Sequence, residues 1–489
     1  MLKIILSIGA IQAVAIIIQF ARTKVVAILL GPEGVGVVST IDQIAQFAAF
    51  TVAFSLPLAS VKFLSKAHSE GHGAFKRSYA GFLKLLTLIS VAGTGIAAAL
   101  VYFRPEVLGP SVEKYQLYVL LALLSIPTLI LSGFFTNVLA SAQKYRESAS
   151  LAIITNAVTT AAVISGVLTI GILGVFAGGT FAGLALTLGI IIYLWKRADL
   201  PFFSSDADIF SELKRSPNIV SFAGMLYLGS FSYMLSLLVA RYAIISNFGE
   251  AEAGLLQGAI VLSVAIGMVL NPANGLYLTP IMNRDIAKEE KIKAAVEFQR
   301  KMVMILCLVS LPIVMFPQLM LTILFSNKFA AVGNIVFLFI FAQLITQLSG
   351  VNQAFLIGAD DLKVYAVITT AGQFGFAILA WILAPAYGIA GIAIGSIISS
   401  LVIFLASLFR LKMKHGFSLP WNLRWLMGFS LSIVLLAGWT SGLASELAVH
   451  SVILKCIYLA IFVASLFFFL NDDERMSLSL LRVRYMFRG

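Results

Sequence analysis

The sequence predicts an all-α polytopic membrane protein of about fourteen transmembrane helices: two six-helix lobes related by a pseudo-twofold axis along the membrane normal, plus two C-terminal helices. Three observations predict this fold: the composition, a glycine pattern that occurs twice, and the distribution of basic residues. Of the 489 residues, 60% are hydrophobic and 11% are charged, and the mean hydropathy is +0.99. Soluble domains carry about 25% charged residues, so this composition indicates a membrane protein.

Each predicted transmembrane helix is an apolar run of about 20 residues or more, which is long enough to cross the hydrocarbon core. In chain order the runs are residues 4–30, 37–60, 80–102, 117–140, 149–170, 174–195, 218–246, 254–281, 302–325, 333–357, 364–384, 388–409, 423–442 and 450–470. Between the eighth and ninth runs, residues 283–301 carry mixed charge and predict a surface helix.

A duplicated glycine pattern divides the chain. Residues 30–40 read LGPEGVGVVST and residues 248–258 read FGEAEAGLLQG, which aligns two pairs of glycines at an offset of 218: Gly31 with Gly249 and Gly36 with Gly254. Nearly the same offset relates four later positions: Gly171, Gly174, Gly178 and Lys66 align with Gly388, Gly391, Gly395 and Arg284. Such an offset indicates a duplicated unit, and duplicated membrane halves are typical of secondary transporters.

The duplication predicts the domain boundaries. We expect an N-terminal six-helix lobe over residues 1–200, a C-terminal six-helix lobe over 217–412, an additional helix pair over 421–470 and a cytoplasmic tail over 471–489. An even number of crossings returns the chain to its starting side, so the two lobes have the same orientation. Residues 196–217 are polar, contain two prolines and form the expected linker between the lobes.

Basic residues predict the orientation in the membrane. With the N-terminus in the cytoplasm, 27 of the 34 Lys and Arg residues fall on inward-facing segments and four fall on outward-facing loops. This asymmetry predicts that both termini are cytoplasmic. It also accounts for the net charge of +12, which therefore indicates no nucleic-acid partner and adds only a weak attraction to the lipid bilayer.

Ionisable residues inside predicted spans are candidates for function, because a charge there costs about 2.5 kcal/mol or more. Arg22 and Lys24 lie near the outer end of the first span, and Asp42 lies at a similar depth on the second. The sequence leaves open whether Asp42 simply pairs with one of these cations. Arg241 has no such acid, since Ile260 stands where the second copy would repeat Asp42. It either snorkels outward or lines an aqueous cavity for an anion, because guanidinium matches phosphate oxygens.

Uncharged amides also gather inside the predicted spans. Asn271 and Asn274 flank Pro272 in the eighth span, and Gln343 and Gln347 are one turn apart in the tenth. Amides bind sugar hydroxyls well, and they also form hydrogen bonds between membrane helices. Both interpretations stay open for each residue.

Several functions are disfavoured by what the sequence lacks. It contains no Gly-Lys dipeptide and therefore no Walker A loop for ATP. His68 and His72 form a short pair without a third defined ligand, which is a poor metal site. Outward loops are too short for a folded domain with an active site. We therefore expect a transporter with no catalytic residue, no metal and no cofactor.

Four short motifs resemble a known group of transporters. These are TKVVAILLGPEGVGVVST at 23–40, EAGLLQG at 252–258, YLTPIMNR at 277–284 and LFSNKFAAV at 324–332. Together they resemble the polysaccharide-transporter branch of the multidrug/oligosaccharidyl-lipid/polysaccharide exporter superfamily, which includes O-antigen and common-antigen flippases. The resemblance covers essentially the whole chain. The additional helix pair is similar to that of lipid II flippases and of some capsule or exopolysaccharide exporters.

The resemblance implies two lobes around a central cavity in the bacterial inner membrane. It implies that the protein translocates an undecaprenyl-diphosphate-linked oligosaccharide, such as an O-antigen, common-antigen or exopolysaccharide repeat unit, from the inner to the outer leaflet by alternating access. It further implies that Lys24 and Arg241 face the cavity, and that a glycan polymerase and a chain-length regulator of polysaccharide or lipopolysaccharide biosynthesis are partners. At the cytoplasmic entrance, Lys62, Lys66 and Arg284 are expected to collect the diphosphate, or else to act as topology anchors.

Two other functions compete with this one. A cation-coupled multidrug or metabolite antiporter of the same superfamily needs a buried carboxylate, for which Asp42 is the one plausible candidate. A membrane-embedded glycan polymerase or ligase is disfavoured by the short outward loops and by the lack of a catalytic cluster. The sequence therefore favours the flippase.

Overall fold

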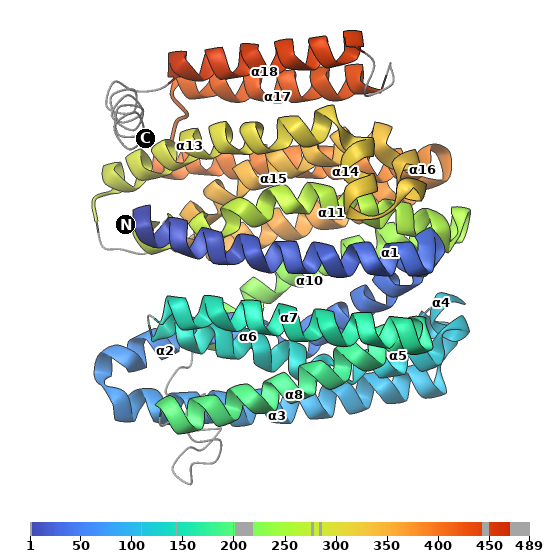
Figure 1. Cartoon of the computed structure of the whole chain (residues 1–489). Helices are drawn as coiled ribbons and strands as arrows, with labels where there is room; N and C mark the ends of the chain where they lie inside the picture. Colours follow the sequence, from blue (N-terminus) through green and yellow to red (C-terminus); the bar gives the residue numbers. More distant parts are fainter. Residues whose placement is uncertain are drawn as a thin grey trace, which may run out of the picture. The chain divides into compact units, whose positions relative to one another are not determined.

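The computed structural model describes residues 2–108, 110–142, 144–198, 200, 219–274, 278–282, 286–442 and 449–469. Within these ranges every regular element is a helix (Figure 1), which confirms the predicted all-α fold. Eleven helices are long and apolar enough to cross a membrane, and some of them contain two predicted spans. The exact number of crossings stays a prediction. Most of the expected linker and the expected tail lie outside the described residues.

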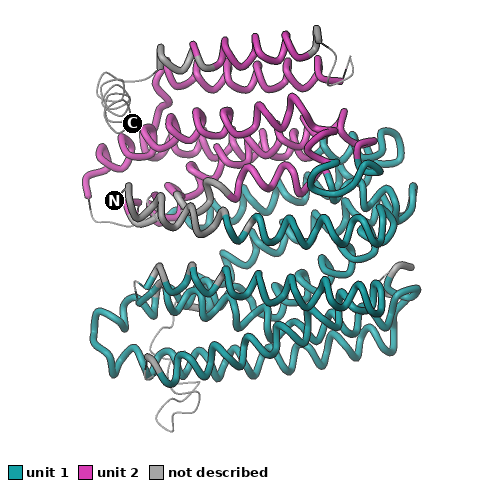
Figure 2. The backbone as a smooth tube through the Cα atoms, viewed as in Figure 1, with its two compact units in different colours: residues 1–258, 322–329, 361–395 teal, residues 259–321, 330–360, 396–489 magenta. Residues whose placement is uncertain are grey.

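The described chain divides into two compact units, coloured separately in Figure 2. Unit 1 contains residues 1–258, 322–329 and 361–395, and unit 2 contains residues 259–321, 330–360 and 396–489. These units are defined by contact, whereas the expected lobes are defined by equivalent positions in the duplication. The lobe boundaries therefore stay a prediction.

Unit 1 is built mainly from the N-terminal helices. Its elements are α1 (Leu2–Ala53), α2 (Leu56–Glu70), α3 (His72–Phe103), the 3-10 helix η1 (Pro105–Leu108), α4 (Pro110–Lys114), α5 (Gln116–Leu123), α6 (Ile126–Ser141), α7 (Tyr145–Ile170), α8 (Ile172–Ala198), α10 (Ile219–Phe248), the start of α11 (Glu250–Ala273) and the first part of α16 (Leu362–His415). Within this unit α7 packs against α8 and α1, α2 packs against α3 and α6, and α1 packs against α10.

Unit 2 contains most of the later helices. Its elements are the rest of α11, α12 (Thr279–Met282), α13 (Lys288–Met315), most of α14 (Pro317–Leu324), part of the 3-10 helix η3 (Asn327–Val332), α15 (Gly333–Gly358), the rest of α16, α17 (Trp421–Ser441) and α18 (Val449–Phe469). Helices α13, α15 and α17 pack against one another, and α17 packs against α18. The charged segment expected as a surface helix is helical from Lys288 and forms the start of α13, because no glycine or proline interrupts it before Pro312.

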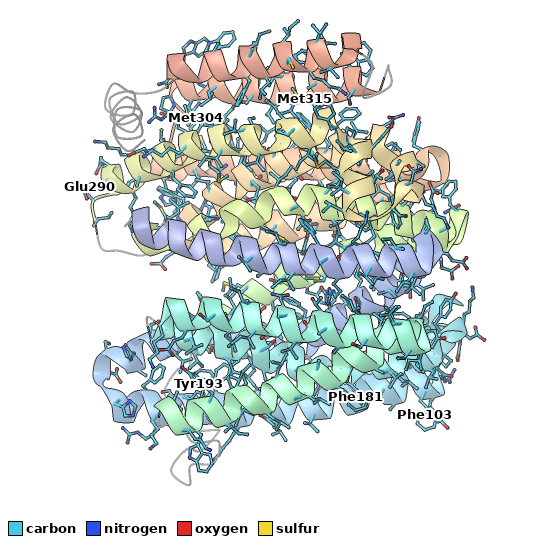
Figure 3. All side chains as sticks on the ribbon, viewed as in Figure 1. Phe103, Phe181, Tyr193, Glu290, Met304 and Met315 are labelled. Carbon is cyan, nitrogen blue, oxygen red and sulfur yellow. The ribbon has the colours of Figure 1, made fainter. Side chains whose placement is uncertain are left out.

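The outer sides of the helices carry large apolar side chains, as expected for contact with lipid. Phe103 at the end of α3 and Phe181 on α8 are 73% and 69% exposed, and both are labelled in Figure 3. Glu290, also labelled there, lies instead in the charged first turn of α13. Apolar residues of this size would not stay exposed to water over so many helices, so this surface faces the bilayer.

Two of the long helices contain a glycine with a backbone conformation that other residues rarely adopt. In α1, Gly31 has φ 66° and ψ −174° and is followed by Pro32. In α16, Gly388 has φ 56° and ψ −136°. Because glycine has no Cβ, it populates positive φ readily, and proline is well placed in the first turn of a new helix. Each glycine therefore ends one predicted span and begins the next.

The duplication is visible in the backbone of these glycines. Gly171 lies between α7 and α8 with φ 64° and ψ −139°, nearly the conformation of Gly388. Gly249 lies between α10 and α11 with a φ of 86°, and its partner in the first copy, Gly31, also has positive φ. Equivalent positions thus make equivalent turns, which is what a pseudo-twofold relationship requires.

The same equivalence extends to helix packing in the two hairpins. A Cβ placed on Gly174 of α8 would lie 1.9 Å from the carbonyl oxygen of Gly166 on α7. At the corresponding position of α16, a Cβ on Gly391 would lie 2.4 Å from the carbonyl oxygen of Leu383. Gly174 and Gly391, which have no side chain, thus let the backbones of each hairpin approach closely.

The most informative contact joins the two copies themselves. A Cβ on Gly36 of α1 would lie 1.9 Å from the carbonyl oxygen of Glu250, and a Cβ on Gly254 of α11 would lie 1.9 Å from the carbonyl oxygen of Pro32. Position 32 corresponds to 250, and 36 corresponds to 254, at the offset of 218. The contact is therefore reciprocal, as at a twofold axis, and the local pseudo-twofold axis passes between Gly36 and Gly254.

Candidate substrate-binding site

Arg241 of α10 is the most deeply buried charged residue that the structure describes in the membrane helices of unit 1. Its exposed fraction is 3%, and it lies seven residues before the end of the helix. The side chain does not snorkel toward the helix end, because its guanidinium group is held by three polar side chains. A buried cation must be compensated by such contacts, since an uncompensated one costs several kcal/mol.

Three side-chain oxygens accept hydrogen bonds from the Arg241 guanidinium group. Nε donates to Oε1 of Gln43 at 2.6 Å, Nη1 donates to Oγ of Ser39, and Nη2 donates to Oε1 of Gln257. Ser39 in turn donates to the carbonyl oxygen of Gly36 at 3.1 Å, so its hydroxyl has a free lone pair for the arginine. All three partners are neutral, and the guanidinium group keeps its full charge.

The site lies beside the local twofold axis. Ser39 on α1 and Gln257 on α11 are 218 residues apart and therefore occupy equivalent positions in the two copies. They follow the Gly36–Gly254 contact by one turn. The two Nη atoms of Arg241 thus bridge equivalent positions of two facing helices.

Gln43 also carries a donor with no partner of its own. Its Nε2 atom is buried, and among the residues that the structure describes no acceptor bonds to it. A buried donor left unsatisfied costs about 1–3 kcal/mol. Because this amide is already held through its oxygen by Arg241, the free N–H and the guanidinium group lie at the same place. Together they are suited to an anion that accepts hydrogen bonds.

Asp42 and Arg22 complete the charged part of the cluster. The Asp42 carboxyl group interacts electrostatically with Arg22 and with Arg241. Both Asp42 and Arg22 are half-buried. One acid thus faces two cations, which leaves the cluster with a positive charge. Of the two cations considered for Asp42 from the sequence, Arg22 is the electrostatic neighbour.

Lys24 has a different partner from the one its depth suggested. Its Nζ donates to the backbone carbonyl oxygen of Thr322 in α14 at 2.6 Å. Thr322 belongs to the short segment that packs within unit 1. The half-buried lysine therefore satisfies a helix-end carbonyl rather than Asp42.

The predicted amides belong to unit 2, whereas the Arg241 cluster belongs to unit 1. Gln343 and Gln347 of α15 are half-buried, and their amide nitrogens lie over Gly267 of α11. The amide nitrogen of Asn274 lies 3.6 Å from the position of a Cβ on Gly350. The side chain of Asn271 lies outside the described residues.

The expected cytoplasmic entrance is described only in part. Lys66 is exposed near the end of α2, as an entrance residue or a topology anchor would be. The side chains of Lys62 and Arg284 lie outside the described residues.

Three functional candidates were missed by the sequence interpretation: Ser39, Gln43 as a direct partner of Arg241, and Gln257. The duplication held a signal for two of them, because Ser39 and Gln257 are a polar pair at equivalent positions one turn past the aligned glycines. The signal for Gln43 was its adjacency to Asp42. None of these signals indicated Arg241 as the shared partner.

Comparisons with known proteins identify related chains. The family described as "Polysaccharide biosynthesis protein" matches residues 1–285. A solved structure of the lipid II flippase MurJ in an inward closed conformation is similar with a TM-score of 0.69 at 15% identity, covering 94% of this chain and 99% of that one. No curated protein matches this sequence.

Multidrug transporters share the fold as well. An inward-facing structure of a multidrug resistance MATE family transporter of the MOP superfamily has a TM-score of 0.64 at 16% identity, covering 84% of this chain and 98% of that one. An outward-facing structure of such a transporter has a TM-score of 0.62 at 15% identity, covering 84% and 95%. At these identities the structural similarity shows the fold alone.

Proposed function

This chain belongs to the polysaccharide biosynthesis protein family, and from that premise we propose that it is a flippase for undecaprenyl-diphosphate-linked oligosaccharide. It moves the diphosphate and its glycan from the inner to the outer leaflet of the bacterial inner membrane by alternating access. Both termini face the cytoplasm in this proposal, and a glycan polymerase and chain-length regulator act on the product. The glycan is an O-antigen, common-antigen or exopolysaccharide repeat unit.

The observation that carries the proposal is the ring of polar side chains that hold Arg241, namely Ser39, Gln43 and Gln257, which we call the Arg241 cage. Guanidinium binds phosphate through two parallel hydrogen bonds. Its present partners are neutral oxygens of Ser39, Gln43 and Gln257, which hold the side chain in place without cancelling its charge. The buried Nε2 donor of Gln43 adds a further group that a phosphate oxygen would satisfy. An anionic headgroup is the ligand that meets both needs.

Neighbouring charges support an anionic ligand. Arg22 and Arg241 outnumber Asp42 in this cluster, and electrostatic attraction is strong where water is scarce. The lipid tail has no reason to enter such a polar site and stays in the bilayer.

A translocation assay tests the proposal. The protein is reconstituted into vesicles with a defined undecaprenyl-diphosphate-linked oligosaccharide, and glycan reaching the opposite leaflet is detected with a membrane-impermeant glycosidase. Arg241→Ala is expected to slow translocation at least about tenfold, because one charge-assisted hydrogen bond contributes about 1.5–3 kcal/mol. Arg241→Lys keeps the positive charge but loses the two-pronged guanidinium group, so its translocation rate should lie between those of the wild type and Arg241→Ala.

Arg424→Ala provides a matched control. Arg424 lies on α17 over the ring of Trp421, at 5.1 Å from the ring centroid, and has no part in the cluster. This variant should translocate at the wild-type rate. Unchanged translocation by a folded Arg241→Ala variant would refute the proposed role of the cage.

A cation-coupled antiporter is the second candidate, because the multidrug transporters share this fold. That mechanism needs Asp42 as its coupling carboxylate. Asp42→Asn should abolish drug export driven by a Na⁺ or H⁺ gradient if the antiporter is correct. In the flippase it removes only a negative neighbour of Arg241, so translocation of the lipid-linked glycan should persist.

A further inference from the structure

The amides of α15 form a polar cluster within unit 2. Gln343 and Gln347 are one turn apart and lie on one face of the helix. A Cβ placed on Gly267 of α11 would lie 2.7 Å from Nε2 of Gln343 and 2.6 Å from Nε2 of Gln347. Both amide groups thus occupy the space that the absent side chain of Gly267 leaves.

This arrangement leaves hydrogen-bonding capacity unused. Each amide group carries two donors and an acceptor. Within the described part of the chain, no side chain or backbone group hydrogen-bonds to either amide, and both side chains are half-buried rather than fully enclosed. An unsatisfied amide in a membrane segment costs several kcal/mol. The two groups therefore face water or a ligand that can bond to them.

The line of contact between α11 and α15 continues toward a third amide. Seven residues beyond Gly267, Asn274 directly follows the end of α11 and lies beside Gly350 of α15, which is itself seven residues beyond Gln343. Seven helical residues correspond to about 10 Å. At each of the two points a glycine of one segment faces an amide of the other. The cluster is elongated, as a short oligosaccharide is.

The chemistry of the cluster distinguishes it from the Arg241 cage. Its amides are neutral, so they offer a diphosphate no charge to bind. They offer paired donors and acceptors instead, which match hydroxyl, ring-oxygen and acetamido groups. These are the polar groups of a neutral sugar.

We propose that Gln343 and Gln347 bind the glycan of the substrate, and that Gly267 is a specificity-determining residue because it keeps space for both amides. The proposal rests on the function proposed above and divides the headgroup between two sites. Arg241 binds the diphosphate, and the α15 amides bind sugar residues. The amides thus contribute through the sugars alone, and a longer glycan makes more of these contacts than a single sugar does.

Two substrates of different headgroup length test this division. In the same vesicles, translocation is measured for an undecaprenyl diphosphate carrying the full oligosaccharide and for one carrying a single sugar. The double variant Q343N/Q347N shortens both side chains by one methylene and keeps both amides. It should weaken the apparent affinity for the long substrate about tenfold, the value of two neutral hydrogen bonds, and affect the short substrate less.

A second variant keeps the test independent of the shortened side chains. Gly267→Ala places a methyl group where the two amide nitrogens now lie, so it should produce the same selective loss. Gln353→Asn is the matched control, because Gln353 lies on α15 but not against Gly267. This variant should translocate both substrates at the wild-type rate. Variants are compared only after their unfolding temperatures are measured.

The outcomes separate the two proposals. If the wild-type protein translocates neither lipid, the proposed function fails. The wild-type protein can instead translocate both lipids. If Q343N/Q347N and Gly267→Ala then slow neither lipid, or slow both to the same degree, the glycan site is refuted and the proposed flippase function stands. A larger loss of translocation for the long substrate than for the short one supports the site. Arg241→Ala should slow the translocation of both substrates.

Discussion

Replacing Gly36 by alanine should force the two copies of the duplication apart. A Cβ at this position would lie 1.9 Å from the carbonyl oxygen and 2.9 Å from the carbonyl carbon of Glu250, and 3.0 Å from the amide nitrogen of Gly254. All three atoms belong to the backbone and cannot rotate away. Ordinary contact begins at 3.4 Å, so the helices must separate by about 1.5 Å locally.

The separation should reach the Arg241 cage. Ser39 and Gln257 lie one turn beyond the contact, on the two helices that move apart, and Arg241 donates to both. A hydrogen bond lengthened by more than about 1 Å is lost. We expect Gly36→Ala to destabilise the protein by about 1–3 kcal/mol, the range for overpacking, and to slow translocation.

The reciprocal geometry makes the prediction sharper. Gly254→Ala meets the carbonyl oxygen of Pro32 at the same 1.9 Å, so it should cost about as much as Gly36→Ala. The same displacement relieves both clashes. The double variant should therefore be less destabilised than the sum of the single variants, as is usual for residues in contact.

Thermal and denaturant-induced unfolding of the purified protein in detergent measures these changes in stability. Gly95→Ala on α3 is the control, because nothing lies within 4 Å of a Cβ there. Wild-type stability in Gly36→Ala, or strict additivity in the double variant, would refute the reasoning that this backbone contact joins the two copies.

The remaining predictions concern charge and backbone conformation. Gln43→Glu places a carboxylate against Arg241, so the free energy of unfolding should not fall, while translocation of the lipid diphosphate is lost; retained translocation would show that the guanidinium charge is not used. Gly388→Ala should lower stability by about 1–3 kcal/mol in thermal unfolding, because its positive φ strains an L residue, and a neutral result would contradict the turn assigned to it. Lys114 and Glu250 form an ion pair of 3.5 Å with the lysine side chain 56% exposed, so a double-mutant cycle with Gln at each position should give a coupling of at most about 1 kcal/mol; a larger value would mean that the pair is far better shielded from water.

Much of the fold follows from local properties of the chain. Apolar length alone predicts where helices cross a membrane, since hydrocarbon tolerates no unsatisfied backbone. Gly31, Gly171, Gly249 and Gly388 all have positive φ. The nearly constant offset between the paired glycines, 218 for Gly31 and Gly249 and 217 for Gly171 and Gly388, indicates the duplication from the sequence. Residues 288–301 are helical, as the mixed charge predicted, but the helix continues to Met315 because no glycine or proline interrupts it before Pro312.

Contacts between helices were not determined by the sequence alone. The depth of Lys24 and Asp42 along neighbouring spans was similar, yet Lys24 bonds to Thr322 in another helix. Position along a helix fixes depth in the membrane, whereas rotation about the axis decides which neighbour a side chain reaches. That rotation depends on packing against all surrounding helices.

The sequence by itself therefore determined the all-helical membrane fold, its internal duplication and the presence of buried charge, because hydrophobic length, glycine conformation and the cost of a charge in lipid act residue by residue. Only the tertiary structure decided what surrounds Arg241. Its partners Ser39, Gln43 and Gln257 come from two helices separated by more than 200 residues, and they meet because Gly36 and Gly254 allow two backbones to touch at the local twofold axis.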